Sequence, residues 1–352
     1  MAVDDEAAAA PPEGALDPSH VLQVGMGFWA SKTLLSAVEL ELFTRLGSEE
    51  MTGEQIRERL GLHPRATFDF LDTLVALGLL EREGSGSEGR YRNTAQTATF
   101  LNKRSPAYIG GLLEMCNARL YRFWGDLTEA LRTGQPQNEI KHTGASMFEE
   151  LYRDEARLEQ FMQAMRGIQT GNFQALAEKF DFSRYKSVCD IGGATGQLSI
   201  VLATRHPHLQ CTSFDLPIVE PIAKRTIDAA GLSNSVSTAA GDFFVDPLPR
   251  ADVICMGNIL HDWNLDRKQK LIRSAYQSLP EGGALIAIEN VIDDDRRHNA
   301  FGLMMSLNML IEFGDAFDYT GAQFDSWCTD AGFRRTEILP LTGPSSAAIA
   351  YK

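Results

Sequence analysis

The sequence has few of the features that mark secreted, membrane-spanning or disulfide-bonded proteins. Its 5 cysteines are scattered through 352 residues and never form a Cys-x-x-Cys pair, which argues against a disulfide framework and against a zinc cluster. No hydrophobic run reaches the length of a membrane span, and the acidic N-terminus lacks the basic and apolar regions of a signal peptide. We therefore expect free, mostly buried thiols in a soluble cytoplasmic protein.

Positive charge is also in short supply. The 33 Lys and Arg residues face 47 Asp and Glu residues, which leaves a formal net charge of -14. Such a balance works against a large footprint on nucleic-acid phosphates, so we expect neither a nucleic-acid nor a membrane partner. The length fits two domains, each large enough to bury a core.

The first 105 residues predict a tail followed by a small helical domain. Residues 1–17 are rich in Ala, Pro and acidic residues and are expected to be disordered. Residues 19–46 carry apolar positions on two helical faces, which is more than one packing partner requires and indicates a partner subunit. Residues 52–93 follow the pattern of a winged helix: helix, turn, helix and β-wing. We assign residues 18–105 to an all-helical winged-helix dimerisation domain.

A winged helix is also a DNA-reading element, so a regulator is an alternative. The second helix of the pattern begins Pro64-Arg65-Ala66-Thr67-Phe68-Asp69, which places one arginine beside one aspartate instead of a basic reading face. We therefore favour packing and dimerisation over contact with DNA.

Residues 106–183 are expected to be helices that link the domains and line a substrate pocket. The segment is rich in aromatic residues and methionine. Such side chains usually fill cores, but they also suit a pocket for a flat apolar ligand.

From residue 184 to the C-terminus, short β-branched runs alternate with helical segments. This alternation predicts a Rossmann-like, doubly wound and mostly parallel α/β sheet, which binds ligands at the carboxyl ends of its strands. Acidic residues and glycines gather at those ends. The candidate cofactor-binding residues are Asp190, Gly192, Gly193, Gly196, Asp215, Leu216, Asp242, Phe243 and Gly257.

The glycine turn after the first strand decides between two cofactor classes. The dinucleotide pattern G-x-G-x-x-G is not met, because position 194 is Ala, and the Asp190 carboxylate would repel a pyrophosphate. A cationic ligand such as S-adenosylmethionine fits better, because Asp215 can accept hydrogen bonds from both ribose hydroxyls. Asp242 and Phe243 after the third strand suit the adenine amino group and ring face.

With these residues in place, the sequence resembles the plant-type small-molecule O-methyltransferases, which include the caffeic acid and acetylserotonin enzymes, and their bacterial relatives that methylate polyketides and antibiotics. The resemblance covers nearly the whole chain and rests on VCDIGGATGQLS, SFDLP, GDFF, GNILHDW and EGGALIAIEN. It implies a class I methyltransferase fold and a metal-independent enzyme that converts S-adenosylmethionine to S-adenosylhomocysteine. It also implies a homodimer whose N-terminal domains intertwine and contribute to each other's pockets.

The resemblance further implies a histidine general base after the fourth strand, and His261 is the matching residue. This base would take the acceptor's proton as the oxygen attacks the methyl group in line. In the family two acids orient the base, and the matching positions are Glu289 and Asp318. Because the family commonly carries Glu at the second position, Glu312 is an alternative to Asp318.

Two departures from the family pattern concern the cofactor loop: Ala194 replaces a glycine, and Gly257 stands where plant members carry a lysine. The same matching assigns pocket-wall positions in the helical segments. They are Phe161, Met165 and Met309, with Asn308, Asn117, Arg119 and Trp124 as further contacts.

The acceptor is expected to be a phenolic or enolic ring of a secondary metabolite, and the sequence leaves open whether oxygen or nitrogen takes the methyl group. Two alternative functions also stay open. One is a relative that binds S-adenosylmethionine but acts as a hydroxylase or decarboxylase, and the other is a ligand-responsive winged-helix regulator.

Overall fold

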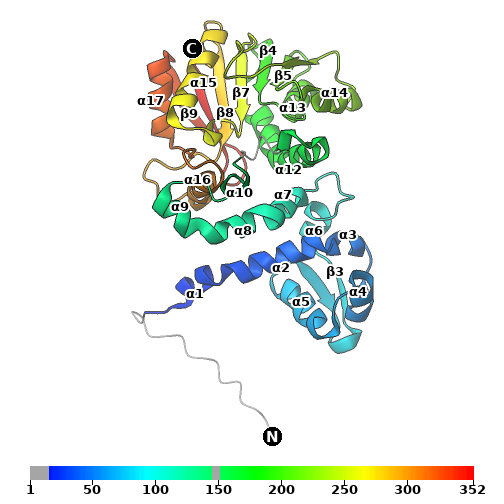
Figure 1. Cartoon of the computed structure of the whole chain (residues 1–352). Helices are drawn as coiled ribbons and strands as arrows, with labels where there is room; N and C mark the ends of the chain where they lie inside the picture. The colour runs from blue at the N-terminus through cyan, green and yellow to red at the C-terminus, as the bar shows by residue number, and fades with distance from the viewer. Residues whose placement is uncertain (1–15, 145–150) are drawn as a thin grey trace. The chain divides into compact units, whose positions relative to one another are not determined.

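The computed structural model describes residues 16–144 and 151–352, and these residues form two compact units that divide between Ser105 and Pro106 (Figure 1). Most of the tail that we predict to be disordered, residues 1–15, lies outside the described residues. All five cysteines are free, and four of them are buried, as expected. Among the described residues, no helix is long and apolar enough to cross a membrane.

The N-terminal unit consists of short helices and one small sheet. Its helices are α1 (Ser19–Gly25), α2 (Gly27–Glu39), α3 (Leu42–Leu46), α4 (Gly53–Leu60), α5 (Pro64–Ala76), η1 (Gly86–Glu88) and α6 (Ala95–Phe100). Its strands β1 (Met51–Thr52), β3 (Arg90–Asn93) and β2 (Leu80–Glu83) pair antiparallel in that order. The prediction of an all-helical domain is therefore wrong in this respect. A glycine-rich turn joins β2 to β3. The side chain of Tyr91 in β3 is buried, and its hydroxyl donates a hydrogen bond to Asp72 of α5 at 2.7 Å.

Local signals in the sequence explain how the helices of this unit begin. Thr52 and Gln55 form a capping box at α4, in which each side chain accepts a hydrogen bond from the other's backbone N–H. At α5, Arg65 forms an ion pair with Asp69, so the arginine at the start of this helix is already paired with an acid.

The C-terminal unit is built on a seven-stranded sheet in which the strand order reverses at β4. The order is β6 (Val236–Ala240), β5 (Gln210–Asp215), β4 (Ser187–Ile191), β7 (Val253–Gly257), β8 (Ala284–Glu289), β10 (Ser346–Tyr351) and β9 (Arg335–Pro340). The first five strands are parallel, and β10 runs antiparallel to both neighbours. The predicted doubly wound, mostly parallel sheet is thus confirmed, with its ligand-binding switch point at β4.

Helices cover both faces of this sheet, which is why its strands are apolar on both sides. One core cluster joins the sheet to α12 (Glu155–Lys179), α13 (Gln197–Arg205) and α14 (Glu220–Ala229). The other joins it to α15 (Leu265–Ser278) and α17 (Gly321–Ala331).

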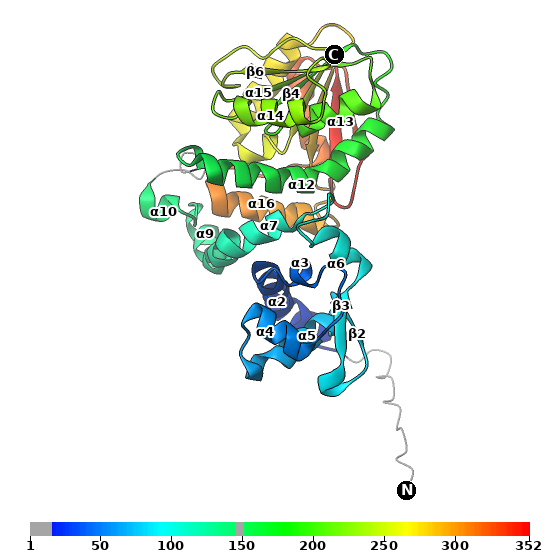
Figure 2. The ribbon, with the colours of Figure 1, turned by 90° about the vertical axis from the view of Figure 1, so that its right-hand side faces the viewer.

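The remaining helices of this unit gather on one side of the sheet (Figure 2). They are α7 (Gly110–Met115), η2 (Cys116–Leu120), α8 (Tyr121–Phe123), η3 (Trp124–Asp126), α9 (Leu127–Thr133), α10 (Ile140–Thr143) and α16 (Ala300–Phe313). The segment η2 is π-helical, a form found often at functional sites, and it carries two predicted pocket residues, Asn117 and Arg119.

Candidate active site

The loop after β4 exposes its backbone to a ligand. Gly192 and Gly196 have φ angles of 69° and 74°, a region that favours glycine, and a side chain at Gly193 would collide with the Ser213 hydroxyl. Ala194 also has a positive φ, 47°, which a small side chain adopts at modest cost. The structure therefore explains why alanine is tolerated at a position where the family carries glycine.

The carboxylate of Asp215 is held in place by the same loop. Its Oδ2 accepts the Ala194 N–H at 2.9 Å, and its Oδ1 accepts the Leu216 N–H at 2.7 Å. Burial raises the pKa of Asp215 to about 6, against the lowering effect of these two N–H groups. Both oxygens are thus fixed at the carboxyl end of β5, and each keeps an unused lone pair.

Asp190 lies inside β4 with 4% of its surface exposed. Burial, followed by the negative charge of Asp215, raises the pKa of Asp190 to about 8. Two neighbouring carboxylates in a protein interior are costly unless a cation joins them. The pair therefore fits the cationic cofactor predicted from the sequence.

Aromatic rings flank the loop near the end of β6. Phe243 lies against Gly192, and the rings of Phe244 and Trp263 pack edge-on at 4.6 Å between centroids. Asp242 closes the turn by accepting the Phe244 N–H on Oδ1 at 2.8 Å. Phe243 is thus placed to cover a flat base bound over the loop.

Two other residues predicted for the cofactor site, Gly257 and Leu216, lie beside apolar side chains of α12. Gly257 ends β7 and faces the Phe173 ring. Leu216 packs with Ala194 and Phe161 against an apolar cluster that includes Leu158. Phe161, predicted to line the substrate pocket, thus packs against the same apolar cluster as Ala194 of the glycine loop.

His261 lies in η4 (Leu260–Asp262) with 6% of its surface exposed. Its Nδ1 is 3.4 Å from Asp318 Oδ1, which is longer than a normal hydrogen bond, and its backbone N–H donates to Glu289 Oε1 at 3.1 Å. The structure therefore brings the three predicted catalytic residues together. Glu289, however, binds the backbone of the histidine and not its ring.

Asp262 is a close neighbour of His261 that sequence reasoning missed. Its Oδ1 lies 3.3 Å from His261 Nε2. Burial by itself lowers the pKa of His261, but Asp262, Asp318 and Glu289 raise it to about 10. These three acids therefore favour the protonated form of the imidazole.

Tyr152 is a second residue that the sequence did not single out. Burial raises its pKa, and so do the negative charges of Asp215, Asp262 and Asp242. The phenol is thus within electrostatic range of carboxylates at the end of β5, after β6 and in η4. Tyr152 falls in none of the recognised segments, so no spacing signal marked it.

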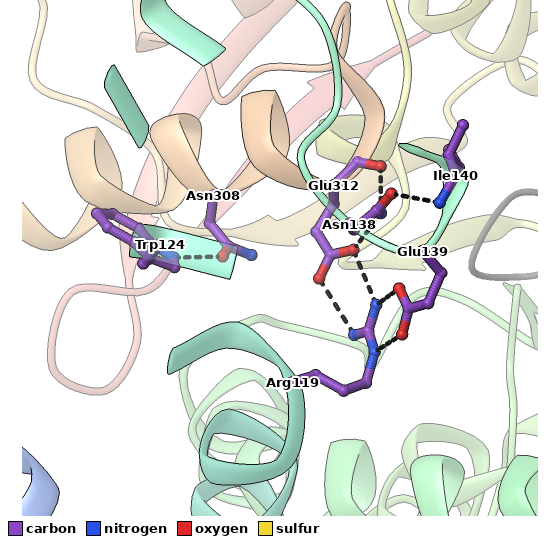
Figure 3. A network of polar contacts seen from close by, with 7 residues as sticks. All are labelled: Arg119, Trp124, Asn138, Glu139, Ile140, Asn308 and Glu312. Carbon is purple, nitrogen blue, oxygen red and sulfur yellow. Dashed lines mark hydrogen bonds and ion pairs between the residues drawn. The ribbon is translucent and has the colours of Figure 1, made fainter. Parts of the chain in front are cut away.

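Glu312, the alternative orienting acid, is engaged elsewhere, as Figure 3 shows. Arg119 binds Glu139 through Nε and Nη2 at 2.6 Å each, and it binds Glu312 at 3.1 and 3.2 Å. Asn138 donates to both the carbonyl oxygen and the carboxylate of Glu312 at 2.8 Å. The structure therefore brings Asp318, and not Glu312, to the imidazole.

The other predicted pocket residues lie on α12, α16 and the segment before them. Trp124 donates its indole N–H to Asn308 Oδ1 at 2.9 Å, which joins two of these residues directly (Figure 3). Met309 is buried in α16, whereas Met165 of α12 and Asn117 of η2 are half-buried. Among the described residues, no group of three or more His, Cys, Asp or Glu side chains is placed to hold a metal ion.

Replacement of Arg119 by methionine is expected to lower the free energy of unfolding by roughly 3 kcal/mol, because two largely buried carboxylates lose their cation. Thermal and urea unfolding followed by circular dichroism measure the loss. Arg122→Met, which removes an exposed arginine from α8, is the matched control and should unfold like the wild type. Equal stabilities of the two variants would contradict a stabilising role for the Arg119 network.

Comparison with known proteins extends the similarity to both units. A family model described as the O-methyltransferase domain matches residues 124–334, and one described as the O-methyltransferase dimerisation domain matches residues 22–103. The chain is 42% identical over 335 residues to the tetracenomycin polyketide synthesis 8-O-methyl transferase of Streptomyces glaucescens, covering 95% of this chain and 97% of that protein.

Two further similar proteins are a bacterial enzyme named for methylation of nitrogen and a human enzyme of known structure. An N,N-dimethyltransferase of Streptomyces rimosus is 35% identical over 315 residues, which cover 89% of this chain and 90% of that protein. The crystal structure of human N-acetylserotonin methyltransferase in complex with S-adenosylmethionine matches with a TM-score of 0.88 at 29% identity, covering 96% of this chain and 99% of that one.

Proposed function

Since this chain belongs to the family of S-adenosylmethionine-dependent O-methyltransferases with an N-terminal dimerisation domain, we propose that it methylates a hydroxyl group of an aromatic or polyketide-like metabolite. His261 is the general base of this proposal. The observation that carries it is the position of the base: the side chain of Ile259, two residues before His261, covers Gly192. The base turn therefore lies against the loop that would hold the cofactor.

The residues around the loop fit S-adenosylmethionine. The fixed oxygens of Asp215 suit the ribose hydroxyls, and the buried carboxylate of Asp190 suits the positive charges of the methionine part. Asp242 and Phe243 suit the adenine. When bound, S-adenosylmethionine supplies an electrophilic methyl group on a positively charged sulfur.

His261 removes the proton of the acceptor hydroxyl, because a phenol with a pKa near 10 is a poor nucleophile while protonated. The imidazole must be neutral to do so, whereas the surrounding acids raise its pKa to about 10. A positive charge that offsets the carboxylates facing the imidazole would oppose its protonation and favour the neutral form. Asp318 then holds the ring in orientation, and Glu289 holds the backbone of the turn.

The pocket helices support a flat, largely apolar acceptor. Phe161, Met165, Met309 and Trp124 contribute apolar or aromatic surface, and Asn308 contributes a polar group. A relative at 42% identity is named as an O-methyl transferase of polyketide synthesis, which favours oxygen as the acceptor atom. Nitrogen is the second candidate, because a relative at 35% identity is named as an N,N-dimethyltransferase.

Incubation with S-adenosylmethionine carrying a deuterated methyl group, and with a panel of hydroxynaphthoates, anthraquinones and matched aryl amines, tests the proposal. Mass spectrometry is expected to find the labelled methyl group on the oxygen of at least one phenolic acceptor. Label only on amines would replace oxygen by nitrogen as the acceptor. Binding of the cofactor with no transfer to any acceptor of the panel would favour a non-methylating relative.

We also propose that two chains pair through α1 and α2 of the dimerisation domain. These helices expose large apolar side chains: Val21 is 72% exposed, Val24 68%, Phe28 55% and Trp29 61%. Exposed apolar faces of this kind mark subunit interfaces. The matching dimerisation-domain model covers both helices from residue 22 onward.

Trp29→Glu is expected to convert the dimer to a monomer, because a buried interface tryptophan typically contributes about 2 kcal/mol or more to binding. Size-exclusion chromatography with light scattering at micromolar concentration measures the mass. Leu131→Glu, which changes a 60% exposed leucine on α9, is the control and should remain a dimer. A dimeric Trp29→Glu protein would place the interface elsewhere.

A further inference from the structure

Lys268 of α15 is a lysine with 0% of its surface exposed. Burial of an ammonium group is costly unless the surroundings compensate its charge and its hydrogen bonds. The proposed function assigns no role to this residue, so its position requires a separate explanation.

The ammonium of Lys268 contacts the two chain segments that carry the base and its orienting acid. Its Nζ donates a hydrogen bond to the carbonyl oxygen of Trp263, two residues after His261. It also lies 3.9 Å from the centroid of the Phe317 ring, and Phe317 directly precedes Asp318. A single buried group thus connects the His261 turn to the Asp318 segment.

A second contact joins the same two segments at the surface. Asn264 Nδ2 donates to Asp315 Oδ2 at 2.8 Å. The Lys268 ammonium is the buried member of this pair of ties, and it is the one that supplies a positive charge.

Lys268 and His261 are surrounded by the same acidic side chains. Asp262 of η4, Glu289 at the end of β8, and Asp318 act on both Lys268 and His261, and Asp315 acts on Lys268 as well. Burial lowers the pKa of Lys268, and these carboxylates act against that effect, which leaves it at about 8. Two basic groups therefore share one set of buried acids.

We propose that Lys268 is a positioning residue for the base: its ammonium ties the His261 turn to the Asp318 segment and supplies a positive charge to the carboxylates that face the imidazole. The proposal rests on the proposed function in one respect, the assignment of His261 as the base. It adds that the neutral, proton-accepting imidazole depends on a lysine that contacts neither substrate nor cofactor.

The direction of the effect follows from the sign of the charge. A positive charge next to the acids opposes protonation of His261, so its removal makes the imidazole hold its proton more tightly. Because Lys268 has a pKa of about 8 and His261 one of about 10, the lysine is neutral where the imidazole titrates, so a positive charge that persists at that pH should shift the His261 midpoint downward. A purely structural lysine would change stability without moving that midpoint.

The test is a histidine titration of the full-length chain by nuclear magnetic resonance from pH 5 to 11, with ¹⁵N-labelled histidine and S-adenosylhomocysteine as the added ligand. His261→Gln assigns the His261 signals. Lys268→Gln keeps a donor for the Trp263 carbonyl without the charge, Lys268→Met fills the space without a donor, and Lys268→Arg keeps the charge. Arg273→Gln, at an exposed position of the same helix, is the control.

Lys268→Arg, whose guanidinium stays charged at the pH where Lys268 has lost its proton, is expected to lower the His261 midpoint by about one pH unit, whereas Lys268→Gln, Lys268→Met and Arg273→Gln leave it within a few tenths. An unchanged midpoint in a folded Lys268→Arg protein overturns the proposal. If both neutral variants fail to fold while Lys268→Arg folds, the charge serves the fold itself and the proposal is also overturned.

The proposed function fails on a different result. A wild-type protein that binds neither S-adenosylmethionine nor S-adenosylhomocysteine by calorimetry would remove that function, and the His261 titration would still report on Lys268.

Discussion

His261→Ala is expected to slow methyl transfer by about 10²- to 10⁴-fold, the usual contribution of a general base, while S-adenosylmethionine still binds. The binding should survive because the glycine loop, Asp190 and Asp215 do not depend on the imidazole for their hydrogen bonds. Single-turnover mass spectrometry with a phenolic acceptor found in the panel measures the rate, and calorimetry measures the binding.

The control for this variant is His298→Ala, which removes an exposed histidine ahead of α16. It should transfer methyl groups at the wild-type rate. A His261→Ala protein that is as fast as this control would show that the acceptor loses its proton to another group. Asp262, 3.3 Å from the imidazole, would then be the first residue to test.

Asp215→Ala is expected to weaken the binding of S-adenosylmethionine by about 100-fold or more, because charged hydrogen bonds contribute roughly 1.5–3 kcal/mol each. The carboxylate also accepts the N–H groups of Ala194 and Leu216, so its loss loosens the glycine loop. Calorimetric titration with S-adenosylmethionine measures the change. Asp330→Ala, at an exposed position of α17, should bind like the wild type, and equal binding by both variants would remove Asp215 from the cofactor site.

The same site predicts how cofactor binding depends on pH. Burial raises the pKa of Asp190 to about 8 and that of Asp215 to about 6, and a cation binds the ionised forms. Affinity should therefore fall as the pH is lowered through 8 and fall further below 6. Affinity that is constant across this range would mean that neither carboxylate faces a positive charge of the cofactor.

The sequence was sufficient for features that depend on one segment at a time. The alternation of β-branched runs and helices predicted the doubly wound sheet, and the residues that follow β4, β5 and β6 could be read directly from the strand ends. The all-helical description of the N-terminal unit is wrong, because β2 and β3 pair in the segment where the sequence predicts a β-wing and β1 adds a third strand. Only β1 was missed, because a run of two residues carries too little periodicity to separate it from a turn.

Features that depend on two distant segments were missed. Lys268 reads as one charge among several in the sequence of α15, and only the return of residues 315–318 to this helix explains its burial. Glu312 was a reasonable second acid by spacing, but Arg119, 193 positions earlier in the chain, binds it. Contacts of this kind between distant segments depend on tertiary packing and leave no local pattern in the sequence.

The Arg119 network also limits how this enzyme can be re-engineered for new acceptors. Chimeras that import residues 110–143 of a relative exchange much of the pocket wall, but they would separate Glu312 and Asn308 of α16 from Arg119, Asn138 and Trp124. A buried carboxylate without its arginine costs more stability than most pocket changes. Residues 110–143 and α16 should therefore be exchanged together. We expect acceptor specificity to transfer between relatives only when both segments come from the same protein.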